Sequence, residues 1–171
     1  MKRSYFFALL CALLLGTNVL RGMDGMIVTD ISTITNGDKV YLATQGTSPI
    51  GVTGCDSNNK DATVSSESSL WITYAVEVDK NVVTLKDESK NQYIASPGSS
   101  NVFKYGDTGG AVTITEKGVV MFGGRPLCQN DTYYRCYKSV GNYIPFYIYK
   151  IGTEKPTLYL IPKFGKNKGQ E

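Results

Sequence analysis

Beyond its first 22 residues, the chain has no sustained spacing of apolar residues at the helical period. It consists instead of short runs in which apolar and polar residues alternate, separated by turn-forming residues. Such alternation gives each strand one apolar face and is typical of half-buried β-strands. Clear examples are residues 74–79, 112–115 and 144–149. The pattern therefore predicts an all-β fold.

Three segments share one form, in which an apolar strand is followed by a polar turn, a second short apolar strand and a glycine. They occupy residues 40–54, 83–98 and 112–124. Three half-buried hairpins can close around a shared interior and leave few exposed strand edges. We expect a β-trefoil-like fold or a small closed β-barrel built from short hairpins, with a β-sandwich as the alternative. A single domain is predicted over residues 26–151.

The N-terminus has the character of a secretory signal. Lys2 and Arg3 precede an apolar run of 11 residues, 5–15, which is too short to span a bilayer because a membrane helix needs about 20 residues. We assign residues 1–22 to a signal peptide and expect a secreted or cell-surface protein that is not transmembrane after signal removal. Residues 152–171 are expected to add one strand and a basic tail.

The charge balance argues against a nucleic-acid partner. The chain has 18 Lys and Arg residues against 15 Asp and Glu residues, and three of the basic residues lie in the predicted signal peptide. The remaining domain is formally neutral, whereas nucleic-acid binders need a basic face. The sequence contains no His, which excludes Ser-His-Asp and Cys-His catalysis and His-ligated zinc. We predict no metal site and no cofactor.

Cys128 and Cys136 flank a loop that contains turn-forming residues. If the protein is exported, these two can form a disulfide, which would stabilise the fold by about 2–3 kcal/mol. The alternative is that both thiols are reduced and buried, as unpaired cysteines often are. The pair is therefore a disulfide candidate.

Glu77 and Asp79 lie two residues apart on one predicted strand. Their side chains would project from the same face, about 7 Å apart by the rise of a strand. Glycoside hydrolysis needs two facing carboxyl groups and no His. This pair flanks a polar turn, however, and is expected to face water.

Residues 54–69 form the longest stretch of low hydrophobicity and are predicted to be a surface loop. Trp71, the only tryptophan, follows this stretch. We expect its ring in the core rather than at a ligand.

Aromatic residues near the end of the domain give the strongest signal for binding. Six of the 12 Tyr residues lie between positions 133 and 149. If the last two strands pair through a turn at Val140 and Gly141, tyrosines from both strands form one outer surface with Arg135 at its centre. Tyr and Arg are enriched at binding hot spots, and aromatic faces stack on sugar rings, although strand tyrosines also fill cross-strand pairs. The predicted ligand-binding residues are Tyr133, Arg135, Tyr137, Tyr147 and Tyr149.

The closing segments RCYKS (135–139) and IYK (148–150), together with ITNGDKVYL (34–42), resemble a known module. It occurs in secreted, often multidomain proteins of anaerobic Gram-negative gut and oral bacteria. The resemblance covers most of residues 26–151. It implies a β-rich exported module, and no catalytic activity is attached to these motifs.

These observations predict an exported, non-catalytic binding module that recognises a protein or carbohydrate ligand at the cell surface or outside the cell. Two alternatives stay open. One is a carboxylate-based hydrolase, and the other is a purely structural interaction domain.

Overall fold

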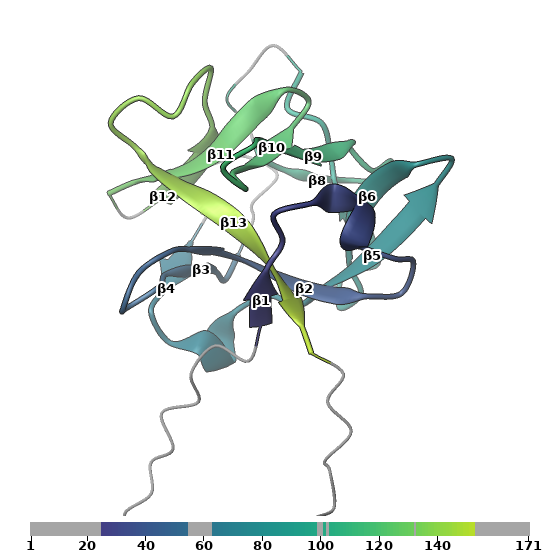
Figure 1. Ribbon diagram of the computed structural model, residues 1–171, viewed down its shortest axis with the longest axis horizontal. Coiled ribbons are helices and arrows are strands. Elements are labelled where there is room, and N and C mark those ends of the chain that lie inside the picture. Colours follow the sequence, from purple (N-terminus) through teal and green to yellow (C-terminus); the bar gives the residue numbers. More distant parts are fainter. Residues whose placement is uncertain (1–24, 55–62, 99–100, 102, 132, 153–171) are drawn as a thin grey trace, which may run out of the picture.

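The computed structural model describes residues 25–54, 63–98, 101, 103–131 and 133–152 (Figure 1). The predicted signal peptide and the segment 153–171, which holds the predicted extra strand and tail, lie outside the described residues. Strands and two short 3-10 helices, η1 (Ile31–Thr33) and η2 (Ser68–Leu70), make up the regular structure of the described part. The strands are β1 (Gly25–Ile27), β2 (Lys39–Thr44), β3 (Gly51–Val52), β4 (Val64–Ser65), β5 (Tyr74–Asp79), β6 (Val82–Asp87), β7 (Gln92–Ile94), β8 (Tyr105–Gly106), β9 (Val112–Ile114), β10 (Val120–Phe122), β11 (Arg125–Asn130), β12 (Tyr133–Cys136) and β13 (Ile144–Ile151).

The strands join into one antiparallel sheet that closes on itself. The pairings run from β2 through β5, β6, β9, β10, β11 and β13. β13 then pairs with β2 again over five residue pairs, from Phe146↔Thr44 to Lys150↔Val40. The all-β prediction is confirmed, and the strands form a closed ring of pairings.

The chain passes through the same pairing scheme three times. We call β2–β5 repeat 1, β6–β9 repeat 2 and β10–β13 repeat 3. In each repeat the first strand pairs antiparallel with the second, at Ala43↔Gly51, Lys86↔Tyr93 and Met121↔Pro126. In each repeat the first strand, or the residue before it, also pairs with the fourth, at Val40↔Tyr74, Val83↔Val112 and Val119↔Tyr147.

The three predicted hairpin segments all contain paired strands, but they are not equivalent to one another. Residues 40–54 and 83–98 contain the first and second strands of repeats 1 and 2. Residues 112–124 contain β9 and β10, the last strand of repeat 2 and the first of repeat 3. The equivalent segment of repeat 3 lies about eight residues further along the chain, at β10 and β11, which pair with each other.

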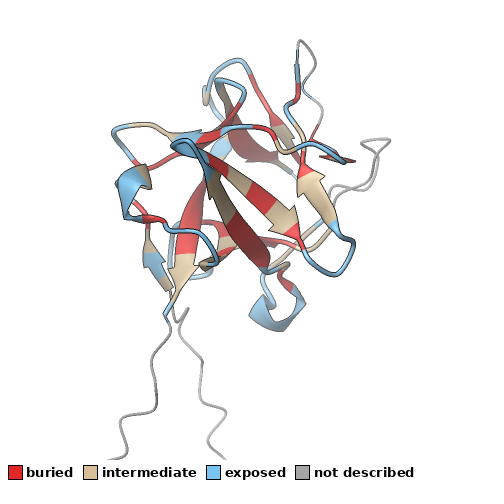
Figure 2. Cartoon of the chain, turned by 90° about the vertical axis from the view of Figure 1, so that its right-hand side faces the viewer, coloured by how far each residue is buried: buried red, intermediate tan, exposed pale blue. Residues whose placement is uncertain are grey.

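The interior of the ring holds the main hydrophobic core (Figure 2). Val40, Leu42, Leu85, Val120 and Ile148 from the ring strands have almost no exposed surface. Burial of a side chain of this size stabilises a fold by about 1.5–3 kcal/mol. Phe103, Phe122, Tyr134 and Phe146 join this cluster with edge-on or tilted ring contacts.

A second, smaller cluster covers the outer face of β2 and β13. It consists of Ala43, Trp71, Val119, Tyr147 and Tyr149. Trp71 is 7% exposed, so its predicted place in a hydrophobic core is confirmed. Its Nε1 donates a hydrogen bond of 2.7 Å to the Ser65 carbonyl, which satisfies the only polar group of the buried ring.

Two local predictions are only partly right. β12 and β13 do not pair with each other, because β11 lies between them and Cys128 pairs with both Arg135 and Pro145. The predicted turn at Val140 and Gly141 is present, since the Tyr143 amide donates a hydrogen bond of 3.0 Å to the Val140 carbonyl and Gly141 has a φ of 52°, but it does not join two paired strands. The chain turns between β11 and β12 at Asp131, whose φ is 60°.

The described residues 63–69 of the predicted surface loop are all exposed or half-buried, as expected, but they include β4 and the start of η2, because Val64 pairs with Val52. Residues 55–62 of this segment lie outside the described part.

Among the described residues, no helix has the length and apolar character needed to cross a lipid bilayer.

Candidate functional site

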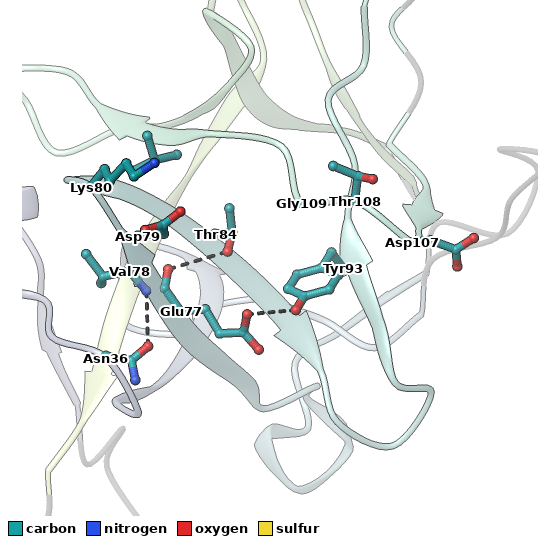
Figure 3. Close-up of a pocket in the computed structure, with 11 residues that line it drawn as sticks. Asn36, Glu77, Val78, Asp79, Lys80, Thr84, Tyr93, Asp107, Thr108 and Gly109 are labelled. Carbon is teal, nitrogen blue, oxygen red and sulfur yellow. Dashed lines mark hydrogen bonds between the residues drawn. The ribbon is translucent and has the colours of Figure 1, made fainter.

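An open groove of about 730 Å³ lies on the outer face of the β5–β6 hairpin (Figure 3). One wall is the hairpin itself, and the opposite wall is the segment 107–109 that leads into β9. The lining combines a larger apolar surface with acidic, basic, amide, hydroxyl and phenol groups. It consists of Asn36, Glu77, Val78, Asp79, Lys80, Val82, Thr84, Tyr93, Asp107, Thr108 and Gly109.

Strand alternation places the polar side chains of the hairpin on the groove side. Val76, Val83 and Leu85 belong to the core and Val78 packs against it, so Glu77, Asp79 and Thr84, which alternate with them along the strands, face outward. Glu77 and Thr84 are direct cross-strand partners on this outer face. The hairpin turns at Lys80 and Asn81, which both have positive φ angles of 47° and 67°; this sharp turn brings the ends of β5 and β6 together.

Glu77 and Tyr93 form the shortest hydrogen bond described among the residues that line the groove. The Tyr93 hydroxyl donates a hydrogen bond of 2.7 Å to Glu77 Oε2. Lys86 Nζ lies 3.8 Å from Glu77 Oε1 and 5.1 Å from the centre of the Tyr93 ring. The hydrogen bond to Glu77 raises the pKa of Tyr93, because loss of the phenol proton would place a second negative charge beside the carboxylate. Tyr93 therefore stays a neutral hydroxyl of fixed direction at physiological pH.

The rest of the groove has polar groups available to a ligand. Asn36 Oδ1 accepts a hydrogen bond of 3.1 Å from the Val78 amide, which leaves the Asn36 NH2 group as a donor. Asp79 and Lys80 are exposed at the hairpin turn, and Thr108 is exposed on the opposite wall. The groove thus offers both donors and acceptors of hydrogen bonds.

The carboxylates of the groove do not converge. Glu77 and Asp79 both line it, as expected from their spacing on one strand. Figure 3 shows the Glu77 carboxylate directed at Tyr93, the Asp79 carboxylate further along the hairpin, and Asp107 beyond Tyr93. Glycoside hydrolysis needs two carboxyl groups that face each other across the bond to be cleaved, so this arrangement favours binding over acid-base catalysis.

Sequence reasoning missed Tyr93 and Gly109. A Cβ atom on Gly109 would lie 2.7 Å from the Thr84 Cβ and 3.2 Å from the Tyr93 ring. The backbone of the 107–109 segment therefore rests directly on β6 and β7. An outward-facing aromatic residue on a short strand, such as Tyr93, can indicate a binding surface. Its partner Glu77 is 16 residues away in the sequence, however, so their contact could not be predicted from local alternation.

The structure brings together three of the five predicted ligand-binding residues. Tyr133 and Arg135 share one face of β12, and Tyr137 directly follows the strand. The Tyr143 ring stacks on Tyr137 with 3.9 Å between ring centres. The Arg135 guanidinium lies 5.0 Å from the centre of the Tyr133 ring. We call these four residues the tyrosine–arginine patch. It is a second candidate site.

Tyr147 and Tyr149 do not belong to this patch. They are 9% and 6% exposed and pack in the second hydrophobic cluster with Trp71. Their predicted position on an outer binding surface is wrong, because Ala43 and Tyr41 of β2 pair with them and Trp71 packs over this face. Tyr137 is also mostly buried, at 8% exposed, whereas Tyr133 and Arg135 are half-buried.

The candidate disulfide between Cys128 and Cys136 is not formed, so the alternative of two buried thiols holds. Cys136 pairs with Leu127, and Cys128 pairs with Arg135, so the two thiols point to opposite faces of the β11–β12 ladder. Both are buried, and burial raises the pKa of Cys128 to about 11. Cys128 is therefore protonated at physiological pH and is a poor nucleophile. The described residues also contain no cluster of three or more carboxylate or thiol side chains that could hold a metal ion.

Comparisons with protein-family models, with characterised protein sequences and with solved structures return no match for this chain. The resemblance to exported modules of anaerobic bacteria therefore stays a prediction.

Proposed function

We propose that this protein is an exported, non-catalytic binding module of the β-trefoil type that recognises a glycan in the groove on β5 and β6. The observation that carries the proposal is the groove itself, in which Glu77 fixes the Tyr93 hydroxyl beside unused amide, carboxylate and hydroxyl groups. Export is inferred from the N-terminal sequence, which has a basic start and a short apolar run.

The trefoil assignment is supported by the pairing scheme. A trefoil has a six-stranded barrel and three hairpins, formed by three repeats of four strands. Here the first and fourth strands of the repeats are β2, β5, β6, β9, β10 and β13, and successive members of this series pair or bridge with one another, as β13 does with β2. The second and third strands form the pairs β3–β4, β7–β8 and β11–β12.

A glycan suits the chemistry of the groove better than a purely apolar ligand. Each sugar hydroxyl both donates and accepts a hydrogen bond, so it is best matched by a lining that holds both kinds of group. Asn36 supplies a donor, the Asp79 carboxylate supplies an acceptor, and the oxygen of the Tyr93 hydroxyl still has acceptor capacity. The volume of about 730 Å³ accommodates more than one sugar ring.

The test is a binding titration of the protein with a panel of neutral oligosaccharides. Asp79→Asn keeps the size of the side chain and removes its charge, so we expect it to weaken binding by about 10-fold or more, as loss of a charged hydrogen-bond acceptor does. Tyr93→Phe tests the hydroxyl in the same way. Glu116→Gln, an equally conservative change at the exposed β9–β10 turn, is the matched control and should leave affinity unchanged. Affinity that is equal in all three variants would contradict the groove assignment.

A further inference from the structure

We propose that the tyrosine–arginine patch is a second binding site, and that it takes an acidic sugar whose carboxylate is held by Arg135. The patch lies on β12 and the segment that precedes β13, whereas the groove lies on β5, β6 and the segment 107–109. The two surfaces share no residue, so the proposal does not depend on the groove.

Arg135 is a cation without a counterion in the part of the chain that the structure describes. Lys39, Lys86 and Lys150 each lie within ion-pair distance of a carboxylate. Arg135 has no such described partner, and its guanidinium lies 5.0 Å from the centre of the Tyr133 ring. Its Nε is buried and donates no hydrogen bond to any described group. A guanidinium that is partly removed from water and lacks a carboxylate partner is unsatisfied. Because its Nε is buried, an anionic ligand would meet the guanidinium at the terminal Nη groups and supply the missing counter-charge.

The residues around Arg135 add recognition of a ring. Tyr133 and Tyr143 are both half-exposed beside the guanidinium and the buried Tyr137. Asn130 Nδ2 donates a hydrogen bond of 3.0 Å to the Tyr133 hydroxyl, which fixes that phenol group. Burial raises the pKa of Tyr137, and its neighbours Tyr133 and Tyr143 add to this effect. The Tyr137 phenol is therefore neutral near pH 7, and the half-exposed phenols of Tyr133 and Tyr143 are within reach of sugar hydroxyl groups.

The combination selects one class of ligand. The planar fork of a guanidinium matches a carboxylate with two parallel hydrogen bonds. Aromatic faces stack on the C–H groups of a pyranose ring, and phenol hydroxyls bond to sugar hydroxyls. An acidic peptide offers the carboxylate but not the surrounding hydroxyls. A uronic acid in a glycan chain offers all three features, so it is the ligand to which we commit.

The experiment is a calorimetric titration of the protein with a tetrasaccharide of galacturonic acid. The reference ligand is the same tetrasaccharide with its carboxyl groups reduced to alcohols. We expect the acidic form to bind and the reduced form to bind at least 10-fold more weakly. Arg135→Gln should lose at least 10-fold in affinity, and Arg135→Lys should lose part of it, since lysine keeps the charge but not the fork. Lys117→Gln, at the exposed β9–β10 turn, removes an equal charge and should change affinity less than twofold.

A measurement on the unmodified protein covers the case in which an Arg135 variant does not fold. The Nε–H proton of Arg135 is followed by NMR while the tetragalacturonate is added, and we expect its resonance to shift in step with binding. Equal affinity for the reduced tetrasaccharide, equal affinity for poly-glutamate, or an Nε–H resonance that does not move would each overturn the proposal. Neutral glycans that fail to bind the groove would leave this result unaffected.

Discussion

In repeats 1 and 2, the second strand and the segment before the fourth strand meet at an equivalent position on the outside of the barrel. One of the two contributes an aromatic residue and the other a glycine, and the two repeats differ in which element contributes which. In repeat 1 the second strand carries Gly51, and Trp71 from the following segment lies over it; a Cβ on Gly51 would be 2.3 Å from the indole ring. In repeat 2 the equivalent strand residue is Tyr93, and the segment contributes Gly109. Trp71 and Gly109 each lie three residues before the residue that pairs with the first strand.

The exchange has different consequences for the surface. Trp71 lies within a hydrophobic cluster, and its only polar atom bonds to a backbone carbonyl. Tyr93 is half-exposed, and its polar atom bonds to Glu77 in the wall of an open groove. The same pairing of an aromatic ring with a glycine therefore gives a buried hydrophobic surface in repeat 1 and a solvent-accessible groove in repeat 2. Which element supplies the aromatic ring decides whether the position is structural or accessible to a ligand.

The largest expected effect is that of Trp71→Ala. Removal of a buried aromatic ring costs about 3–5 kcal/mol of unfolding free energy, whereas Tyr93→Ala should cost about 1 kcal/mol, since the ring is only half-buried and loses mainly one hydrogen bond. Urea denaturation of the two variants measures both values. Similar losses in the two variants would show that the two repeats do not differ as described.

An intermediate effect is expected for the two glycines. Gly51→Ala places a methyl group against the fixed Trp71 ring and should cost about 2–3 kcal/mol, as overpacking does. Gly109→Ala meets Thr84 instead, and should cost about 1 kcal/mol because its segment lies at the surface. The cycle of Gly51→Ala with Trp71→Ala should be strongly non-additive. Additive losses would mean that the clash with the indole is not the cause.

The smallest expected effect is a difference between repeats 1 and 2 in how the free energy of unfolding depends on pH. The hairpin that follows the first strand is held by Thr44 in repeat 1, whose hydroxyl accepts a hydrogen bond from the Ile50 amide. In repeat 2 the residue is the buried Asp87. Burial alone would raise the pKa of Asp87, but hydrogen bonds from Ser89 and from the Tyr105 hydroxyl outweigh it and lower the pKa.

A lowered pKa gives a stabilising contribution that is present above the unfolded-state value of about 3.9 and is lost as the pH falls through the folded-state value. We expect Asp87→Asn to cost about 1–2 kcal/mol at neutral pH, with the difference from the unmodified protein shrinking below about pH 4. Thr44→Val should give a difference that does not change with pH. Unfolding free energies of the three proteins, measured from about pH 7 to pH 2, test this; a constant Asp87→Asn difference would contradict it.

Local alternation predicted much of what the structure contains. It placed Tyr133 and Arg135 on one face of a strand, Glu77 and Asp79 on another, and it indicated an all-β fold. It could not predict the fate of Tyr147 and Tyr149, because a strand has two faces and the sequence does not say that Trp71 packs over the outer one.

The groove could not be predicted from the sequence for a related reason. Its central contact joins Glu77 to Tyr93 across two strand pairings, so it depends on a register that no single stretch of sequence encodes. The start of repeat 3 was hidden in the same way. The β9–β10 hairpin has the same local pattern as β2–β3, and only the pairing of β10 with β11 shows where the repeat begins.

The first and last described strands, β1 and β13, run antiparallel, with Gly25 opposite Ile151. The two ends of the described domain therefore lie side by side, and Figure 1 shows them away from both the β5–β6 hairpin and the β11–β12 ladder. A tether or a fusion partner joined at either end would lie on the same side of the domain and would leave both proposed binding surfaces accessible to solvent.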